Sequence, residues 1–242
     1  RALCGFAGDQ ETSALALDRV WLGEAKLQEP RWSKLAATLW RLRTMAGDLG
    51  ATAMSEAAAA LLVRVTDENM QDPVTALARA DMLIAEMGSS PRVLAAKARV
   101  LWRRGSFHEA LELYDKAIPH FSLGLSWKTD VLRDAGVTAG KASDWPLSAQ
   151  RLTEALSSLS NEEPLVRRVG LLFDLAIAEH LSGRTRDAVD HLGDAVELMA
   201  DDDQKLPAEP LLSVRQLGSQ IIKTIGAEFG YSGLWRKGEM PL

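Results

Sequence analysis

Three stretches of this chain repeat one pattern, and this repetition constrains the fold more than any other feature. The stretches are WRRGSFHEALELYDKAI (102–118), GKASDWPLSAQRLTEAL (140–156) and HLSGRTRDAVDHLGDAV (180–196). They align on small residues, a turn and an apolar stripe. Self-similarity at a period of a few tens of residues is typical of a solenoid, in which each repeat packs on its neighbours.

The chain is predicted to be all-α. Alanine and leucine are abundant, and no run of Val, Ile and Thr alternates with polar residues at the two-residue period of a strand. Apolar periodicity and turn residues predict helices at 11–28, 31–46, 51–66, 73–87, 91–104, 107–120, 126–142, 145–159, 163–182, 185–200 and 208–228.

Small residues twelve positions apart give the repeat a physical basis. The pairs are Ala98/Ala110, Gly136/Ser148 and Ala176/Ala188. Small side chains at matched heights let two antiparallel helices approach closely. The turns between the paired helices are expected at Gly105, Ser143 and Gly183.

This spacing resembles the tetratricopeptide repeat family, most clearly in RRGSFHEALELYDKAI, where the turn glycine, aromatic, Glu-Ala-Leu, Tyr and Lys-Ala-Ile follow the family's order. The resemblance implies a right-handed superhelical solenoid of antiparallel helix pairs. The repeats depart from the family in length, because the intervals from Gly105 to Ser143 and from Ser143 to Gly183 both exceed the family's usual period of about 34 residues.

The predicted domains follow from this resemblance. Repeats are expected over 57–202, divided into 57–90, 91–124, 129–162 and 169–202, and bulky Arg64 occupies the expected small position of the first of them. Residues 1–56 are predicted to be a helical cap or atypical repeat, and residues 203–242 a capping helix with a Gly-rich tail. The chain lacks an initiator Met and is expected to be part of a larger protein.

No catalytic or metal-binding motif is present. The sequence contains neither GxxxxGK[ST] nor GxGxxG, neither HExxH nor CxxC, and its four histidines are scattered. Glu162-Glu163 and Asp201-Asp202-Asp203 are interpreted as solvated acidic loops, and the single Cys4 as an inert thiol that suits a reducing cytoplasm. We therefore expect no enzyme activity, no metal and no cofactor. The net charge of −5 argues against nucleic acid, and no apolar run is long enough to predict a membrane span.

The candidate binding residues lie on the first helix of each repeat, where the resemblance places a concave ligand-binding face. They are Arg92, Arg99, Trp102, Arg103, Arg133, Lys141, Phe173, Asp174, Ile177 and His180. The arginines at 92, 99 and 103 share one side of a helix, and arginine can bind a carboxylate in a bidentate manner. Alternatively, this side is a solvated face whose arginines pair with Glu109 or Asp134.

Two functions remain open from the sequence. The first is a scaffold that binds a protein or peptide, or another domain of the same protein. The second is a sensor or regulatory arm of a multidomain protein, because the long, degenerate repeats also resemble the helical arrays of prokaryotic NACHT/STAND-type signalling and defence NTPases.

Overall fold

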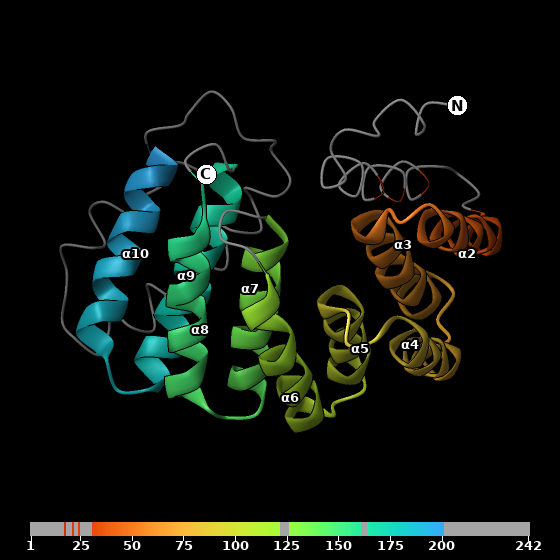
Figure 1. Ribbon diagram of the computed structural model, residues 1–242. Helices are drawn as coiled ribbons and strands as arrows, with labels where there is room; N and C mark the ends of the chain where they lie inside the picture. Colours follow the sequence, from red (N-terminus) through yellow and green to blue (C-terminus); the bar gives the residue numbers. More distant parts are fainter. Residues whose placement is uncertain are drawn as a thin grey trace. The chain divides into compact units, whose positions relative to one another are not determined.

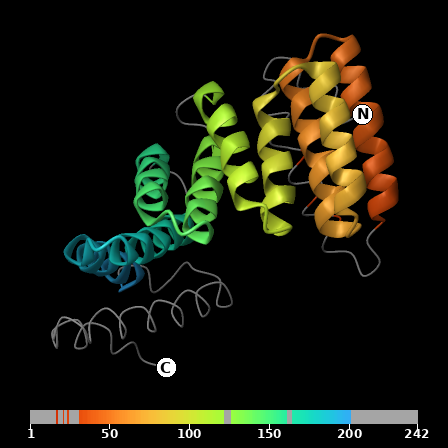
Figure 2. The same cartoon turned by 90° about the horizontal axis from the view of Figure 1, so that it is seen from below.

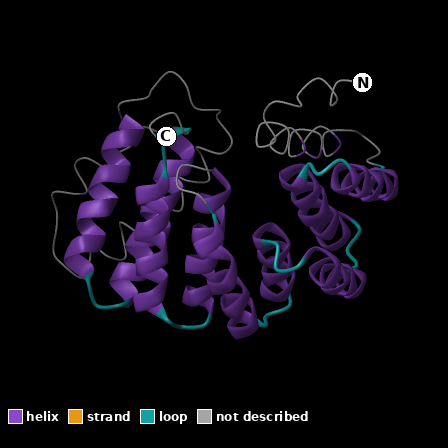
Figure 3. Cartoon of the chain, in the orientation of Figure 1, coloured by secondary structure: helices purple, strands orange, loops and turns teal. Residues whose placement is uncertain are grey.

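The computed structural model describes residues 31–121, 126–160 and 164–200, together with Leu17, Trp21 and Glu24. Within these ranges every regular element is a helix and none is a strand, as Figure 3 shows. The chain divides into two compact units, Arg1–His120 and Phe121–Leu242. The predicted helices at 11–28 and 208–228 lie largely or wholly outside the described residues.

Unit 1 contains five α-helices in its described part (Figure 1). They are α2 (Trp32–Asp48), α3 (Thr52–Arg64), α4 (Pro73–Met87), α5 (Pro91–Arg103) and α6 (Phe107–Ala117). A π-helical turn, η1 (Val65–Asn69), continues α3, and a 3₁₀ turn, η2 (Ile118–His120), follows α6. Helix α3 packs against α2, α4 and α5, and α5 packs against α6.

Unit 2 contains two antiparallel helix pairs in its described part (Figure 2). Helix α7 (Ser126–Lys141) packs on α8 (Trp145–Ser158), and α9 (Leu165–Leu181) packs on α10 (Thr185–Ala200). Helix α8 also packs on α9, which joins the two pairs. The core between α9 and α10 includes Phe173, Ala176 and Leu192. The observed helices in the described ranges match the predicted ones to within a few residues.

The turns within the helix pairs share one hydrogen-bond pattern. Gly105, Ser143 and Gly183 have φ angles of 81°, 64° and 84°, which is the left-handed region. In the first turn, the Gly105 N–H donates to Trp102 O at 2.9 Å and the Ser106 N–H donates to Leu101 O at 3.0 Å. The other two turns have the equivalent bonds, so all three are Schellman motifs. This confirms the predicted positions of the chain reversals.

The small-residue pairs lie at the helix–helix contacts, as predicted. Ala98, Ala110, Ala176 and Ala188 are completely buried. A Cβ atom added at Gly136 would lie 3.2 Å from the Ser148 carbonyl oxygen, closer than most Cβ contacts in proteins. These residues are small because the facing backbone leaves no room for a larger side chain.

The segment 57–90 follows the same plan with one local change. Gln71 precedes Gly105 by one repeat length of the family and has a left-handed φ of 56°, and Ala76 is fully buried. The π-helical turn η1 adds a residue to the helix before this reversal. Arg64 is therefore turned away from the closest packing and is only partly buried, whereas its neighbour Val63 is fully buried.

The remaining domain boundaries stay predictions. Helix α3 begins at Thr52, so the boundary expected between residues 56 and 57 falls inside a helix. The C-terminal segment 203–242 and most of residues 1–30 lie outside the described residues. The same is true of Cys4, Glu162-Glu163 and Asp201-Asp202-Asp203.

Candidate functional site

The arginines of α5 bind acidic residues of the π-helical turn η1. Arg99 Nε lies 2.9 Å from Glu68 Oε1, and Arg103 Nε lies 3.1 Å from Asp67 Oδ2. Arg64 also contacts Glu68, at 3.3 Å. These acidic partners come from a segment between two predicted helices, which the sequence analysis did not consider as a source of partners. The cationic side of α5 is thus partly neutralised within unit 1.

In the cluster formed by these arginines and acids, the acidic side chains are less exposed to solvent than the arginine side chains. The Asp67 side chain is 4% exposed, whereas the Arg99 and Arg103 side chains are 38% and 41% exposed. Burial raises the pKa of Asp67, and the positive charge of Arg103 opposes that rise. Arg103 therefore stabilises the buried carboxylate of Asp67 within unit 1. A ligand bound to Arg103 would have to share its guanidinium group with Asp67.

Two other predicted residues of α5 are buried or partly buried within unit 1. Arg92 is buried, and its Nη1 donates to the Ala53 carbonyl oxygen at 3.4 Å. Trp102 is partly buried, and its indole Nε1 atom is completely buried with no hydrogen-bond partner among the described residues. The prediction that Arg92 offers a ligand contact is corrected, because its side chain ties α5 to α3.

Two of the predicted residues of unit 2 meet on a face shared by α7 and α9. Arg133 Nε donates to Asp174 Oδ2 at 2.8 Å, and Arg167 Nη2 donates to Asp130 Oδ1. Both ion pairs join α7 to α9, so these sides of the two helices are neighbours. The structure therefore brings Arg133 and Asp174 together. This contact could not be predicted from the sequence, in which the two residues are far apart.

Four further predicted residues lie on these two helices, and one of the four is buried in the core. Lys141 is exposed, and Ile177 and His180 are partly buried. His180 Nδ1 lies 3.3 Å from Thr185 Oγ1. Phe173 is 1% exposed and packs in the core between α9 and α10, so its prediction as a binding residue is wrong. Phe173 was predicted from its position in the repeat. Its large apolar side chain instead packs into the core, as such side chains usually do.

A partly buried Glu–His pair between α9 and α10 was not predicted from the sequence. Glu179 is 2% exposed, and its Oε2 lies 2.7 Å from His191 Nδ1. The hydrogen bond to Glu179 raises the pKa of His191, while partial burial opposes the rise. The two residues are twelve apart, like the small-residue pairs, and this spacing was the available signal.

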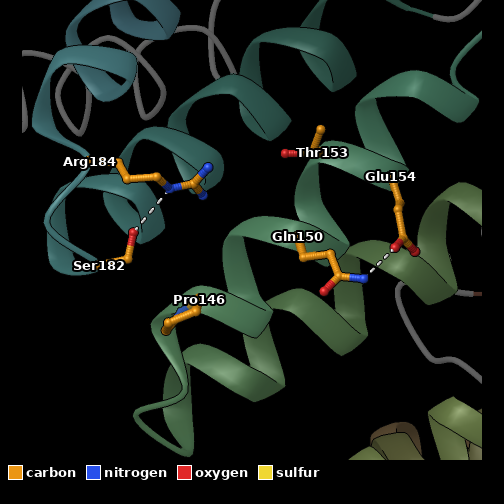
Figure 4. A pocket seen from close by; sticks show the side chains of 6 residues that line it. All are labelled: Pro146, Gln150, Thr153, Glu154, Ser182 and Arg184. Carbon is orange, nitrogen blue, oxygen red and sulfur yellow. Dashed lines mark hydrogen bonds between the residues drawn. The ribbon is translucent and has the colours of Figure 1, made fainter.

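A pocket beside α8 was not predicted from the sequence either. It has a volume of about 470 Å³ and is lined by Pro146, Gln150, Thr153, Glu154, Ser182 and Arg184 (Figure 4). The first four residues follow one side of α8, and the last two belong to the turn between α9 and α10. None of the ten predicted binding residues, all of which are described, lines this pocket.

The described residues hold no cluster of three or more His, Cys, Asp or Glu side chains that would suit a metal ion. Among the same residues, no helix has both the length and the apolar character needed to cross a bilayer. Most of the candidate residues that the structure describes take part in ion pairs, are partly buried apolar groups, or are exposed cations.

No protein-family model matches this chain, and no curated protein matches it either. Several solved structures are similar to it. A putative kinesin light chain with TPR-like repeats from Podosopora anserina superposes with a TM-score of 0.59 at 17% identity, covering 75% of this chain and 91% of that one. A MamA protein superposes with a TM-score of 0.53 at 10% identity, covering 72% and 99%. MamA from Desulfovibrio magneticus RS-1 gives a TM-score of 0.51 at 11% identity, covering 70% and 98%.

These identities are too low to transfer a function, but the similarity covers most of each chain. It agrees with the turns, the small-residue pairs and the helix order described above. The chain therefore has an all-α fold built from tetratricopeptide-like helix pairs.

Proposed function

We propose that this chain is a binding scaffold for a protein or peptide segment, and that the segment binds on the face of α7 and α9 in unit 2. The observation that carries the proposal is the set of two ion pairs, Arg133–Asp174 and Arg167–Asp130, which bring these two helices together. Tetratricopeptide-like arrays use extended surfaces of this kind to bind other molecules.

Beyond the ion pairs, the face becomes more apolar and ends in a cation. Four and eight positions after Arg133, α7 carries Val137 and Lys141; three and seven positions after Asp174, α9 carries Ile177 and Leu181. These spacings keep the side chains on the same side of each helix. Leu181 is 48% exposed and Lys141 is exposed. An apolar strip beside a positive charge suits a peptide with apolar and acidic residues.

The proposed mechanism is recognition by a preformed surface. The helices are held by buried small residues and by interhelical ion pairs, so the face loses little conformational freedom when a segment binds. The role is binding rather than catalysis.

A pull-down from the source organism with the variant Lys141→Glu tests the proposal. Lys141 is exposed and the substitution reverses one charge, so we expect a folded protein that captures less of its partner. Lys116→Glu is the matched control, because Lys116 is also exposed but lies on α6 in unit 1. Equal capture by wild type and Lys141→Glu would contradict the proposed face.

A second candidate is the sensor arm of a larger signalling or defence protein. The observation that favours it is the length of the repeats, which exceeds the usual tetratricopeptide period in both intervals between Gly105 and Gly183. In that case the partner is another domain of the same polypeptide. Cross-linking of the full-length protein in its host, followed by mass spectrometry, distinguishes contacts within one chain from contacts with a separate protein.

A further inference from the structure

One residue that lines the pocket beside α8, Arg184, makes only long contacts with neighbouring side chains. Arg184 is 47% exposed at its side chain. Its Nε lies 3.5 Å from Ser182 Oγ, at the limit of a hydrogen bond, and its Nη1 lies 3.9 Å from Glu179 Oε1, beyond that limit. Figure 4 shows Arg184 and Ser182 on one wall of the pocket. The guanidinium therefore retains most of its capacity to donate hydrogen bonds.

The carboxylate of Glu179 forms only a long ion pair with Arg184, because its other oxygen is held more closely by His191. His191 Nδ1 lies 2.7 Å from Glu179 Oε2, whereas Arg184 Nη1 lies 3.9 Å from Glu179 Oε1. Glu179 is buried, whereas the Arg184 side chain is 47% exposed. The His191–Glu179 pair thus leaves the arginine available at the pocket.

The opposite wall carries a carboxylate that is already engaged. Gln150 Nε2 donates to Glu154 Oε1 at 2.9 Å, and Arg151 Nη1 donates to Glu154 Oε2 at 3.1 Å. Both oxygens of Glu154 are therefore bound, and its charge is compensated by Arg151. Among the residues that line the pocket, the remaining charge that faces a ligand is the positive charge of Arg184.

We propose that this pocket binds a ligand with a carboxylate and an apolar body, the carboxylate on Arg184 and the body along α8. Most of the surface that lines the pocket is apolar, although Pro146 is its one apolar residue among those described, and the volume is about 470 Å³ in a hollow that is open to solvent. Arginine binds carboxylates in a bidentate manner, which gives the site its chemical preference. A peptide C-terminus ending in an apolar residue and a free short-chain acid share this chemistry.

The test is a titration of the full chain followed by ¹H–¹⁵N NMR, with two probes. One probe is hexanoate, and the other is the peptide acetyl-Gly-Ser-Val-Leu with a free carboxylate. Hexanamide and the C-terminally amidated peptide are the neutral counterparts. We expect shifts at Thr153, Ser182 and Arg184 with a carboxylate probe, and much weaker binding of the amides. Binding of the peptide alone identifies a chain terminus as the ligand, and binding of hexanoate alone identifies a free acid.

Variants of the arginine complete the test. Arg184→Gln is expected to weaken binding by about tenfold or more, since a charge-assisted hydrogen bond is lost. Arg184→Lys keeps the charge without the planar fork and should bind with intermediate affinity. Arg186→Gln is the matched control, because Arg186 is exposed two positions away but does not line the pocket.

Three results would overturn the proposal: no shift at these residues with either carboxylate probe, equal binding of the amides, or equal weakening by Arg184→Gln and Arg186→Gln. The pocket and the α7–α9 face are built from different residues. Capture of a partner by the scaffold should therefore persist in Arg184→Gln, which separates this proposal from the proposed function.

Discussion

A Cβ atom added at Gly136 on α7 would lie 2.7 Å from Leu152 Cγ on α8. A Cβ atom in a folded protein does not approach a non-bonded carbon atom so closely, so the helices would have to move apart or Leu152 would have to change rotamer. We predict that Gly136→Ala destabilises unit 2 by about 1–3 kcal/mol, the usual cost of overpacking a core. Urea unfolding followed by tryptophan fluorescence measures the change.

Gly170→Ala is the matched control for this prediction. Gly170 lies within α9, and its added Cβ atom would contact only Arg133 Nη2, at 3.9 Å, among the described residues. Alanine favours the helix more than glycine, so this variant should be about 0.5–1 kcal/mol more stable than wild type. A stabilising effect of Gly136→Ala would show that α7 and α8 are not packed as described.

Ser143 occupies a turn position where the equivalent residues are glycine. Its φ angle of 64° is unfavourable for a residue with a Cβ atom, whereas Gly105 and Gly183 adopt such angles without strain. Ser143→Gly is therefore expected to stabilise unit 2 by about 0.5–1 kcal/mol, measured as a higher urea midpoint. In contrast, Ser106 has a φ of −79°, and Ser106→Gly should bring no gain. A loss of stability in Ser143→Gly would refute the strained turn.

The Glu179–His191 pair predicts how the stability of unit 2 depends on pH. The pKa of His191 is raised in the folded state, chiefly by its hydrogen bond to Glu179, with further contributions from the charges of Glu179, Asp194 and Asp187. The folded state therefore holds the proton more tightly than the unfolded chain does. The stabilisation is complete below the ordinary histidine pKa of about 6.5 and is lost as the pH rises through the raised value.

Urea unfolding of wild type and His191→Gln between about pH 5 and 9 checks this dependence, since the ordinary histidine pKa falls inside that interval. Wild type should lose stability relative to the variant as the pH rises, because Glu179 loses its charged partner. His108→Gln, an exposed position on α6, is the control and should follow wild type. Parallel curves for wild type and His191→Gln would contradict the pair's role.

Arg103 is predicted to stabilise unit 1 through the buried carboxylate of Asp67. Arg103→Gln leaves Asp67 without this partner, and we expect a loss of about 1–2 kcal/mol at neutral pH, below the full cost of breaking a buried pair because Arg103 is partly exposed. Burial raises the pKa of Asp67, so the cost should shrink as the solution is acidified and the carboxyl becomes neutral. Arg104→Gln, at the exposed neighbouring position, should have little effect; an equal effect of both would refute the prediction.

This cluster also affects how partner binding should be tested. Reversing the charges at Arg99 and Arg103 would surround η1 with acidic side chains and destabilise unit 1. A loss of partner binding in such a variant would therefore say little about a ligand surface. Lys141 on α7 avoids this problem, because its exposed side chain can be changed with less effect on the fold.

The amino-acid sequence by itself determined the helices, the reversals at Gly105, Ser143 and Gly183, and the close contact of Gly136 with Ser148. These features follow from local periodicity and from the size of single side chains. Both can be read from a short segment of sequence without knowing what packs against it. The tertiary structure alone decided the surroundings of the charged residues. Arg103 meets Asp67 and Arg133 meets Asp174 because separate helices pack side by side, and a long side chain takes whichever partner that packing brings within reach. Arg184 remains largely available for the same reason, since the packing of α9 on α10 places His191 closer to the Glu179 carboxylate than Arg184 is.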